Sequence, residues 1–277
     1  MILLARVILA TLGLAAGTQV LASTTTDLQA LAAAKRALQR GVNNSKADSI
    51  LQARRQFQAL AAVEPKSARL HYWMAVADWR ATPLLMRDTT RSSRERAKKR
   101  CLSGLKEAQQ ALDLDPGFGE ALALKAGLQG LSLSFGDPSE GPTVGMQMES
   151  DLGRALGMAA NNPRVHLLDG LNTLHKPAFV GGGPAPALAK LRRAIELFAA
   201  DTTADAAAPD WGHDDACLWA GHCAMQLQDH GGARDYFREA LVVNPDNAWV
   251  RYALLPEAER EAAKRGAAQP DTLQSKP

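Results

Sequence analysis

The sequence predicts an all-α protein in which antiparallel helical hairpins stack into an α-solenoid. A pattern with steps of four, three and five residues recurs along the 277-residue chain, most clearly as Ala233, Phe237, Ala240 and Pro245. Steps of four and three keep three residues on one face of a helix, and a proline cannot continue that helix. An alanine-rich chain with only 5% aromatic residues also favours close helix packing over β-strands.

The same steps occur at four other places in the chain. The clear copies are Ala53, Phe57, Leu60, Pro65 and Gly104, Ala108, Ala111, Pro116; the weaker copies are Asp151, Ala155, Met158, Pro163 and Ala187, Leu191, Ala194, Ala199. Helices built to one plan bury their apolar faces against one another, so the pattern predicts a stacked array of repeats.

The first 22 residues are predicted to form a secretory signal peptide that is cleaved after Ala22. Arg6 supplies a positive charge, and the apolar run over residues 7–16 is followed by small residues at the cleavage point. The alternative is an uncleaved anchor helix, but this apolar run is shorter than the roughly 20 residues that a bilayer requires. No cysteine directly follows Ala22, and no later segment is apolar enough to span a membrane. We therefore expect a periplasmic protein without stable membrane insertion.

About ten or eleven helices are expected in one domain over residues 23–265, followed by a disordered tail over 266–277. Apolar residues at helical spacing define each of them. Their expected ranges are 27–40, 46–63, 67–81, 92–114, 118–133, 145–159, 163–176, 185–199, 211–227, 232–243 and 247–265.

Capping residues and helix breakers set the ends of these ranges. Gly41 ends the first helix and Pro65 ends the second. Asn162 is expected to cap the helix that Pro163 opens, because a proline at the first helical position lacks only an N–H that would be unpaired there anyway. The last helix is expected to break near Pro256.

Three segments are expected to be irregular. Strings of glycine and proline predict loops over 136–142 and 179–184, and a polar, alanine-rich linker covers 202–210.

The last hairpin, Asp214–Pro245, resembles a tetratricopeptide repeat. Gly221 stands where that family keeps a small residue, and the second helix carries Phe237 between two alanines. Pro245 closes the unit at the family's period of about 34 residues. The resemblance implies a right-handed α-solenoid that acts as a non-catalytic protein-interaction module.

The earlier units are less similar to the family. Ala75 and Ala126 take the place of the small residue in their first helices, and insertions near residues 82–93 and 136–143 lengthen the spacing between closing prolines. A narrower resemblance, to exported bacterial tetratricopeptide proteins, covers about the C-terminal 115 residues. Its landmarks are Asn162-Pro163-Arg164-Val165, Pro177-Ala178-Phe179-Val180-Gly181-Gly182-Gly183, Trp211-Gly212 and Ala248-Trp249-Val250. It implies no catalytic residue.

The first helices of such arrays line a concave surface, where recognition usually occurs. Two of these helices supply the predicted partner-binding residues, which are Arg69, Tyr72, Val76, Trp79, Asp215, Leu218, His222 and Met225. Tyr72 and Trp79 are attractive peptide anchors because aromatic side chains give a large contact area at low entropy cost. Ordinary packing between helices is the alternative role for both.

A group of metal-ligating residue types lies near the C-terminus. Its members are His213, Asp214, Asp215, Cys217, His222, Cys223 and His230. Cys217 and Cys223 are six residues apart and point to different sides of one helix. No Cys-x-x-Cys pair is present, and the three cysteines of the chain do not form a disulfide framework. We therefore interpret Cys217 and Cys223 as small core residues and predict no metal and no cofactor.

Two further segments invite a functional interpretation. Gly181-Gly182-Gly183 could offer backbone amides to an anion, but it lacks the lysine and hydroxyl of a P-loop, which favours a packing loop. A basic stretch could contact an acidic partner or anionic lipid, although a solvated helix face is the simpler interpretation. Its basic residues are Arg87, Arg91, Arg94, Arg96, Lys98, Lys99 and Arg100.

No hydrolase motif is present, and a formal net charge of +3 does not indicate a nucleic-acid partner. The sequence therefore predicts a non-catalytic scaffold of the cell envelope whose concave face binds an extended peptide or a partner helix. The alternatives are a structural subunit of an envelope complex and a protein that binds a metal or small ligand through the last hairpin.

Overall fold

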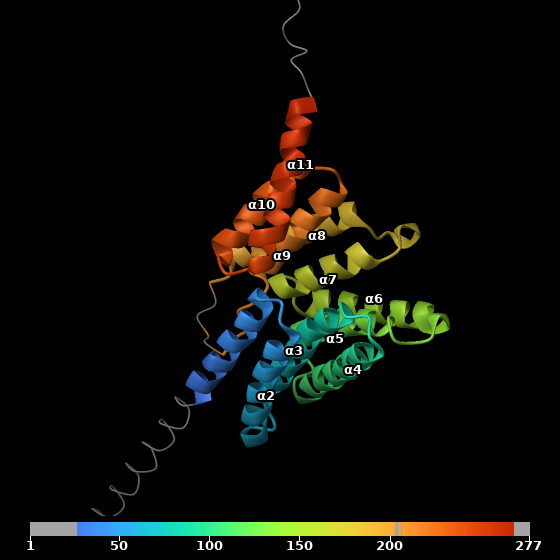
Figure 1. Ribbon diagram of the computed structural model, residues 1–277. Coiled ribbons are helices and arrows are strands. Elements are labelled where there is room, and N and C mark those ends of the chain that lie inside the picture. Colours follow the sequence, from blue (N-terminus) through green and yellow to red (C-terminus); the bar gives the residue numbers. More distant parts are fainter. Residues whose placement is uncertain (1–26, 203–204, 206, 269–277) are drawn as a thin grey trace, which may run out of the picture.

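The computed structural model describes residues 27–202, 205 and 207–268, and within them it contains eleven α-helices and no β-strand (Figure 1). The first helix covers residues 27–43. The others are α2 (Ala47–Val63), α3 (Ala68–Met86), α4 (Arg91–Leu114), α5 (Gly119–Ser132), α6 (Gly141–Met158), α7 (Pro163–His175), α8 (Pro184–Ala200), α9 (His213–Gln226), α10 (His230–Val243) and α11 (Leu255–Ala268). The predicted signal peptide over residues 1–22 lies outside the described residues, as does the end of the predicted tail.

The recurring sequence pattern marks the second helix of each hairpin: α2, α4, α6, α8 and α10. Phe57 in α2 and Phe237 in α10 are completely buried, and the alanines beside them are buried too. Phe57 stacks on Trp73 of α3, with ring centroids 5.5 Å apart. Met158, in the weak copy on α6, is 45% exposed. This helix leaves the regular stack, since α7 packs more extensively on α5 than on α6.

Two predicted helix boundaries, the start of α7 and the break near Pro256, agree with the structure. The Asn162 side chain accepts hydrogen bonds from the backbone N–H groups of Arg164 and Val165, at 2.9 and 3.3 Å, and Pro163 opens α7. In the last helix a π-helical turn, Val250–Leu254, comes immediately before Pro256. A π turn shifts the backbone hydrogen-bond register by one residue. This shift accommodates Pro256, whose backbone nitrogen carries no hydrogen to donate.

Several predicted boundaries were wrong. The first helix does not end at Gly41 but continues to residue 43. α3 continues through Pro83 to Met86 and does not end near Ala81. α6 begins at Gly141 and not at residue 145, because Pro142 is tolerated in a first helical turn. α9 begins only at His213, because Gly212 has a φ of 107° and interrupts the helical path. α11 extends to Ala268, so residues 266–268 belong to the helix and not to a tail.

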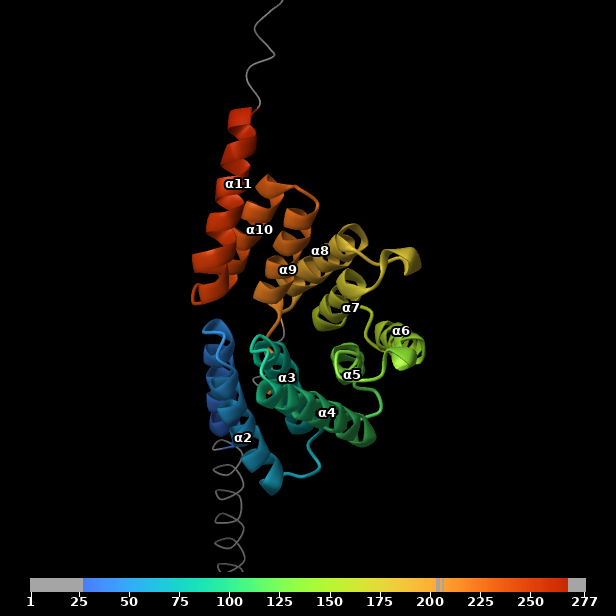
Figure 2. The ribbon, with the colours of Figure 1, turned by 45° about the vertical axis from the view of Figure 1, so that its right-hand side comes forward.

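The stack of hairpins curves until its two ends meet (Figure 2). Asn43, at the end of the first helix, and Asn244, directly after α10, exchange two amide hydrogen bonds of 3.2 and 2.9 Å. The solenoid is therefore a closed turn, and its concave side faces inward between the first helix, α3 and α9.

Candidate functional site

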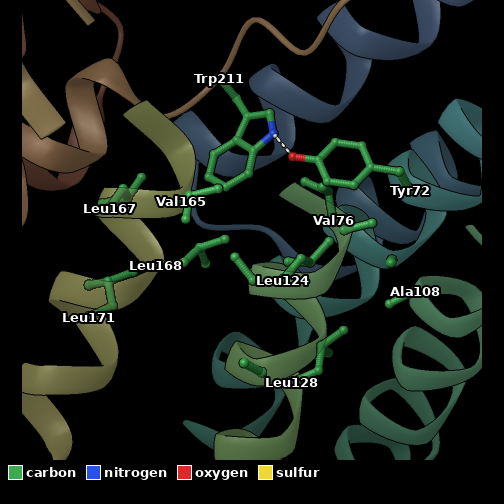
Figure 3. Packing of buried hydrophobic residues seen from close by; sticks show 14 of the residues in the cluster. Tyr72, Val76, Ala108, Leu124, Leu128, Val165, Leu167, Leu168, Leu171 and Trp211 are labelled. Atoms are coloured by element: carbon green, nitrogen blue, oxygen red, sulfur yellow. Dashed lines mark hydrogen bonds between the residues drawn. The ribbon is translucent and has the colours of Figure 1, made fainter. Parts of the chain in front are cut away.

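The centre of the concave side is filled by a joining segment, residues 207–212, that leads into α9. Trp211 lies on this segment and is only 6% exposed. Its Nε1–H donates a 3.0 Å hydrogen bond to the hydroxyl of Tyr72 on α3. Figure 3 shows the indole of Trp211 above Val76 and Val165, so that it joins α3 to α7 through the interior of the curve.

Arg164 of α7 anchors the same segment from the other side. It donates to the backbone carbonyls of Pro209 and Trp211, the latter at 2.9 Å, and to the carboxylate of Glu120 at 3.2 Å. Its guanidinium also lies 5.4 Å from the ring centroid of Phe198. Arg164 is 6% exposed, and its charge is balanced by Glu120. The segment is therefore part of the folded core.

Arg80 connects the two sides of the curve. Its guanidinium pairs with both carboxylate oxygens of Asp215 on α9, one of them at 2.6 Å. It lies 4.8 Å from the ring centroid of Trp79 and 4.9 Å from that of Trp211, and these two centroids are 5.6 Å apart, so it packs against one side of the indole pair. Contact with aromatic rings and bidentate pairing together suit arginine better than lysine.

A pocket of about 600 Å³ remains beside this segment. Its walls are the first helix, α3, the joining segment with the start of α9, and the end of α10. Trp73 and Trp211 lie behind its walls and are almost completely buried, whereas Arg36 and Gln39 lie along the first helix. The Nε1–H of Trp73 is buried and has no hydrogen-bond partner among the described residues. This donor is closed to the solvent, so its missing partner is a cost to the folded protein and not a contact for a ligand.

Charged groups around this pocket are mostly paired within the protein. Lys35 lies 2.9 Å from Asp210 and donates to the carbonyl of Ala208, and Arg69 lies 2.8 Å from Asp205. Arg36 is exposed and has no ion pair with any described residue. Arg36 is thus the lining cation that remains available to a ligand.

The predicted partner-binding residues of α3 have different environments. Arg69 is exposed and Trp79 is half-buried. The prediction that Tyr72 and Val76 are accessible was wrong: they are 0% and 1% exposed. Both face the inside of the curve as expected, but the joining segment crosses that face and covers them.

The predicted partner-binding residues of α9 also differ in their accessibility. Asp215 is buried in its pair with Arg80, and Leu218 is buried in the cluster between α9, α10 and the last helix, so neither is accessible to a partner. His222 and Met225 are half-buried. His222 packs edge-on against Trp219, with centroids 5.5 Å apart, and burial lowers the pKa of its imidazole.

The cysteines are buried as predicted, and the two on α9 belong to different clusters. Cys223 faces the main core, whereas Cys217 faces α10 and the last helix. The side chain of Glu239 on α10 lies close to His213 and Cys217. Sequence spacing gave no signal for Glu239, which is 22 residues beyond Cys217 on another helix. His230 is buried at the start of α10, away from this group.

The basic stretch is largely solvated, in line with its simpler interpretation. Arg94 donates to the carbonyl of Ser134 at 2.6 Å, Arg96 pairs with Asp48, and Arg100 lies 3.4 Å from Asp78. Arg100 is half-buried, and the other six basic residues of the stretch are exposed.

The glycine loop after α7 is tightly folded, as its interpretation as a packing loop requires. A Cβ on Gly182 would lie 1.9 Å from the carbonyl oxygen of Lys176, and Gly181 has a φ of 85°. Phe179 on this loop is 89% exposed. In the described part of the chain no helix is both long and apolar enough to cross a membrane.

No family model matches the sequence, and no curated protein matches it. Solved structures do resemble it. The HusA haemophore from Porphyromonas gingivalis is 22% identical with a TM-score of 0.57, and the match covers 70% of this chain and 92% of that one. TTC0263, a tetratricopeptide protein of Thermus thermophilus, is 15% identical with a TM-score of 0.53, over 82% of this chain and 100% of that one. At these identities the likeness establishes the architecture: the chain has a tetratricopeptide-like fold.

Proposed function

We propose that this protein is an exported, non-catalytic interaction module that binds an extended segment of a partner protein in the pocket beside Trp73. The observation that carries this proposal is the pocket of about 600 Å³ on the concave side, whose wall includes the exposed Arg36. An acidic side chain or a C-terminal carboxylate is an acceptor of the right kind for this guanidinium.

The size of the pocket favours an extended segment over a helix. Pockets of about 300–1,000 Å³ enclose ligands of small-molecule size. A pocket of about 600 Å³ therefore holds a few residues of an extended chain. Val42 and Val243 offer apolar surface to its side chains, and Arg36 offers a charge to an acidic residue or a C-terminal carboxylate.

Periplasmic location is part of the proposal and is supported by the signal-like sequence of residues 1–22. N-terminal sequencing of the protein recovered from a periplasmic fraction tests it. We expect the mature chain to begin at Ser23, and recovery of an uncleaved chain in the membrane fraction would contradict the proposal.

Site-specific photocrosslinking tests the binding surface. A crosslinking amino acid at position 36 lies on the pocket, and one at position 40 lies one helical turn away, exposed and outside the pocket. We expect position 36 to give a defined adduct in native envelopes and position 40 to give none. Equal adducts from both positions would place the partner elsewhere.

A second candidate function is binding of a flat, anionic small molecule such as haem in the same pocket. The favouring observation is a pocket of small-molecule size with an exposed arginine in its wall, in a fold shared with a haemophore. Titration with haem, followed by its absorption spectrum and by quenching of tryptophan fluorescence, tests it. Arg36→Ala should weaken saturable binding and Arg40→Ala should not; absence of saturable binding would exclude this function.

A further inference from the structure

Three metal-ligating side chains of different types converge between α9 and α10. His213 is the first residue of α9, Cys217 follows one turn later on the same face, and Glu239 lies on α10. One ligand atom from each, a ring nitrogen, the sulfur and a carboxylate oxygen, lie within 4.8 Å of one another. None of the three side chains forms a hydrogen bond or ion pair with another residue in the described part of the chain. The donor atoms are therefore free to bind an ion.

The surrounding structure holds two of these side chains in place. The ring of His213 stacks on Phe198 of α8, with centroids 5.3 Å apart and planes 10° apart. Gly212 permits this approach, because a Cβ there would lie 2.9 Å from the ring of Phe198. Cys217 is completely buried, whereas Glu239 is exposed and can adjust. Such support is typical of a preorganised ligand set.

We propose that His213, Cys217 and Glu239 bind a zinc ion that links α9 to α10. Imidazole, thiolate and carboxylate are all zinc ligands, with bond lengths of about 2.0–2.3 Å, and three protein ligands leave a fourth position for water or a partner's side chain. Tetrahedral coordination places ligand atoms about 3.3–3.7 Å apart. Because the three atoms lie within 4.8 Å of one another, their spacings need to shorten by at most about an ångström to reach that geometry.

The protonation states of the free protein favour metal binding at His213 and oppose it at Cys217. Burial lowers the pKa of His213, which keeps its imidazole neutral and able to bind a metal. Burial, together with the charge of Glu239, raises the pKa of the Cys217 thiol. Zinc therefore replaces the thiol proton: the S–H bond breaks, a zinc–sulfur bond forms, and one proton is released to water.

The chain offers matched controls for each ligand type. Cys223 is a second buried cysteine on α9 that faces the other side of the helix, and His222 is a second half-buried histidine that packs on Trp219. Neither belongs to the proposed site.

Metal titration of the full mature chain, stripped with a chelator and dialysed, tests the proposal. We expect one zinc ion per chain, an increase in Tm with zinc, and a sulfur-to-metal charge-transfer band when cobalt replaces zinc. Cys217→Ser should abolish the band, and His213→Gln and Glu239→Gln should each weaken zinc binding at least about 100-fold, because loss of an outer-shell contact alone costs about 10–100-fold.

The control variants Cys223→Ser and His222→Gln should bind zinc as the unchanged protein does. Glu239 is exposed, so Glu239→Gln keeps the fold even if Cys217→Ser does not, and far-ultraviolet circular dichroism checks this. Absence of stoichiometric binding, or an equal loss in Cys217→Ser and Cys223→Ser, would overturn the proposal. Neither result bears on the pocket beside Trp73.

Discussion

Gly221 of α9 lies against the ring of Phe237 of α10 so closely that a Cβ at position 221 would be 2.5 Å from the phenyl Cε1. Phe237 is completely buried, so its ring cannot move aside without disturbing the cluster between α9, α10 and the last helix. The small residue and the aromatic residue that carry the family resemblance are thus two halves of one contact.

Gly221→Ala should therefore destabilise the protein by about 1–3 kcal/mol, the usual cost of overpacking. Gly153 of α6 is the matched control, because it is exposed and a Cβ there meets no atom within 4 Å. Gly153→Ala should stabilise by about 0.5–1 kcal/mol through the unfolded chain. Urea unfolding midpoints measure the stability of the two variants. Shifts in the same direction would mean that the close approach of Gly221 to Phe237 does not affect stability.

The amide pair of Asn43 and Asn244 should couple the two ends of the solenoid. Each single change to alanine removes both hydrogen bonds of the pair and should cost about 1 kcal/mol, although the remaining amide keeps its bond to Asp214 or from Gln39. In a double-mutant cycle the two changes should show a coupling energy of about 0.5–1.5 kcal/mol. Asn44→Ala is the control, since Asn44 is exposed and bonds only to the carbonyl of Arg40.

Hydrogen exchange localises this effect. Loss of the pair should speed exchange in the helix over 27–43 more than in α7, because local opening precedes global unfolding. Additive effects of Asn43→Ala and Asn244→Ala would show that the two ends are stable independently.

The repeat architecture was predictable because its determinants are local. The positions of Ala53, Phe57, Ala108, Ala111 and their equivalents fix one buried face per helix, and the same spacing places each closing proline beyond the helix end. Asn162 and Pro163 specified the start of α7 by the same kind of neighbouring contact.

The occupant of the concave side was not predictable, because its contacts are distant in sequence. Trp211 bonds to Tyr72, 139 residues earlier, and Arg80 pairs with Asp215, 135 residues later. Helical periodicity correctly predicted that Tyr72 and Val76 face the inside of the curve. It carries no information on whether an irregular segment, such as residues 207–212, returns to cover that side.

Tyr72→Phe tests the contribution of this covering segment. The change keeps the ring that packs on Phe118 but leaves the buried Nε1–H of Trp211 without its acceptor. We expect a loss of about 1–3 kcal/mol in the free energy of unfolding. Tyr252 is 76% exposed, so Tyr252→Phe should change stability by less than about 0.5 kcal/mol. Equal stability of the two variants in thermal unfolding would mean that the hydrogen bond adds nothing.

Asp214 should make stability depend on pH in the direction opposite to most carboxylates. Burial raises the pKa of Asp214 to about 6, and the negative charge of Asp215 raises it further. Hydrogen bonds from Asn244 and Asn247 lower this pKa but do not cancel the rise. The folded state then binds the proton more tightly than the unfolded state, whose aspartate has a pKa of about 3.9. The contribution of Asp214 is fully present below about pH 4 and is lost as the pH rises through 6.

Asp214→Asn removes this titration and keeps an oxygen acceptor for Asn244. The variant should gain stability relative to the unchanged protein between pH 4 and 7, reaching on the order of 2–3 kcal/mol. Asp88 provides the opposite sign, because a hydrogen bond from Ser93 lowers its pKa, so its contribution is present above about pH 4 and Asp88→Asn should gain relative stability only as the pH falls below that value. Urea unfolding at a series of pH values measures both differences. A pH-independent difference for Asp214→Asn would show that this buried carboxyl titrates alike in the folded and unfolded chains.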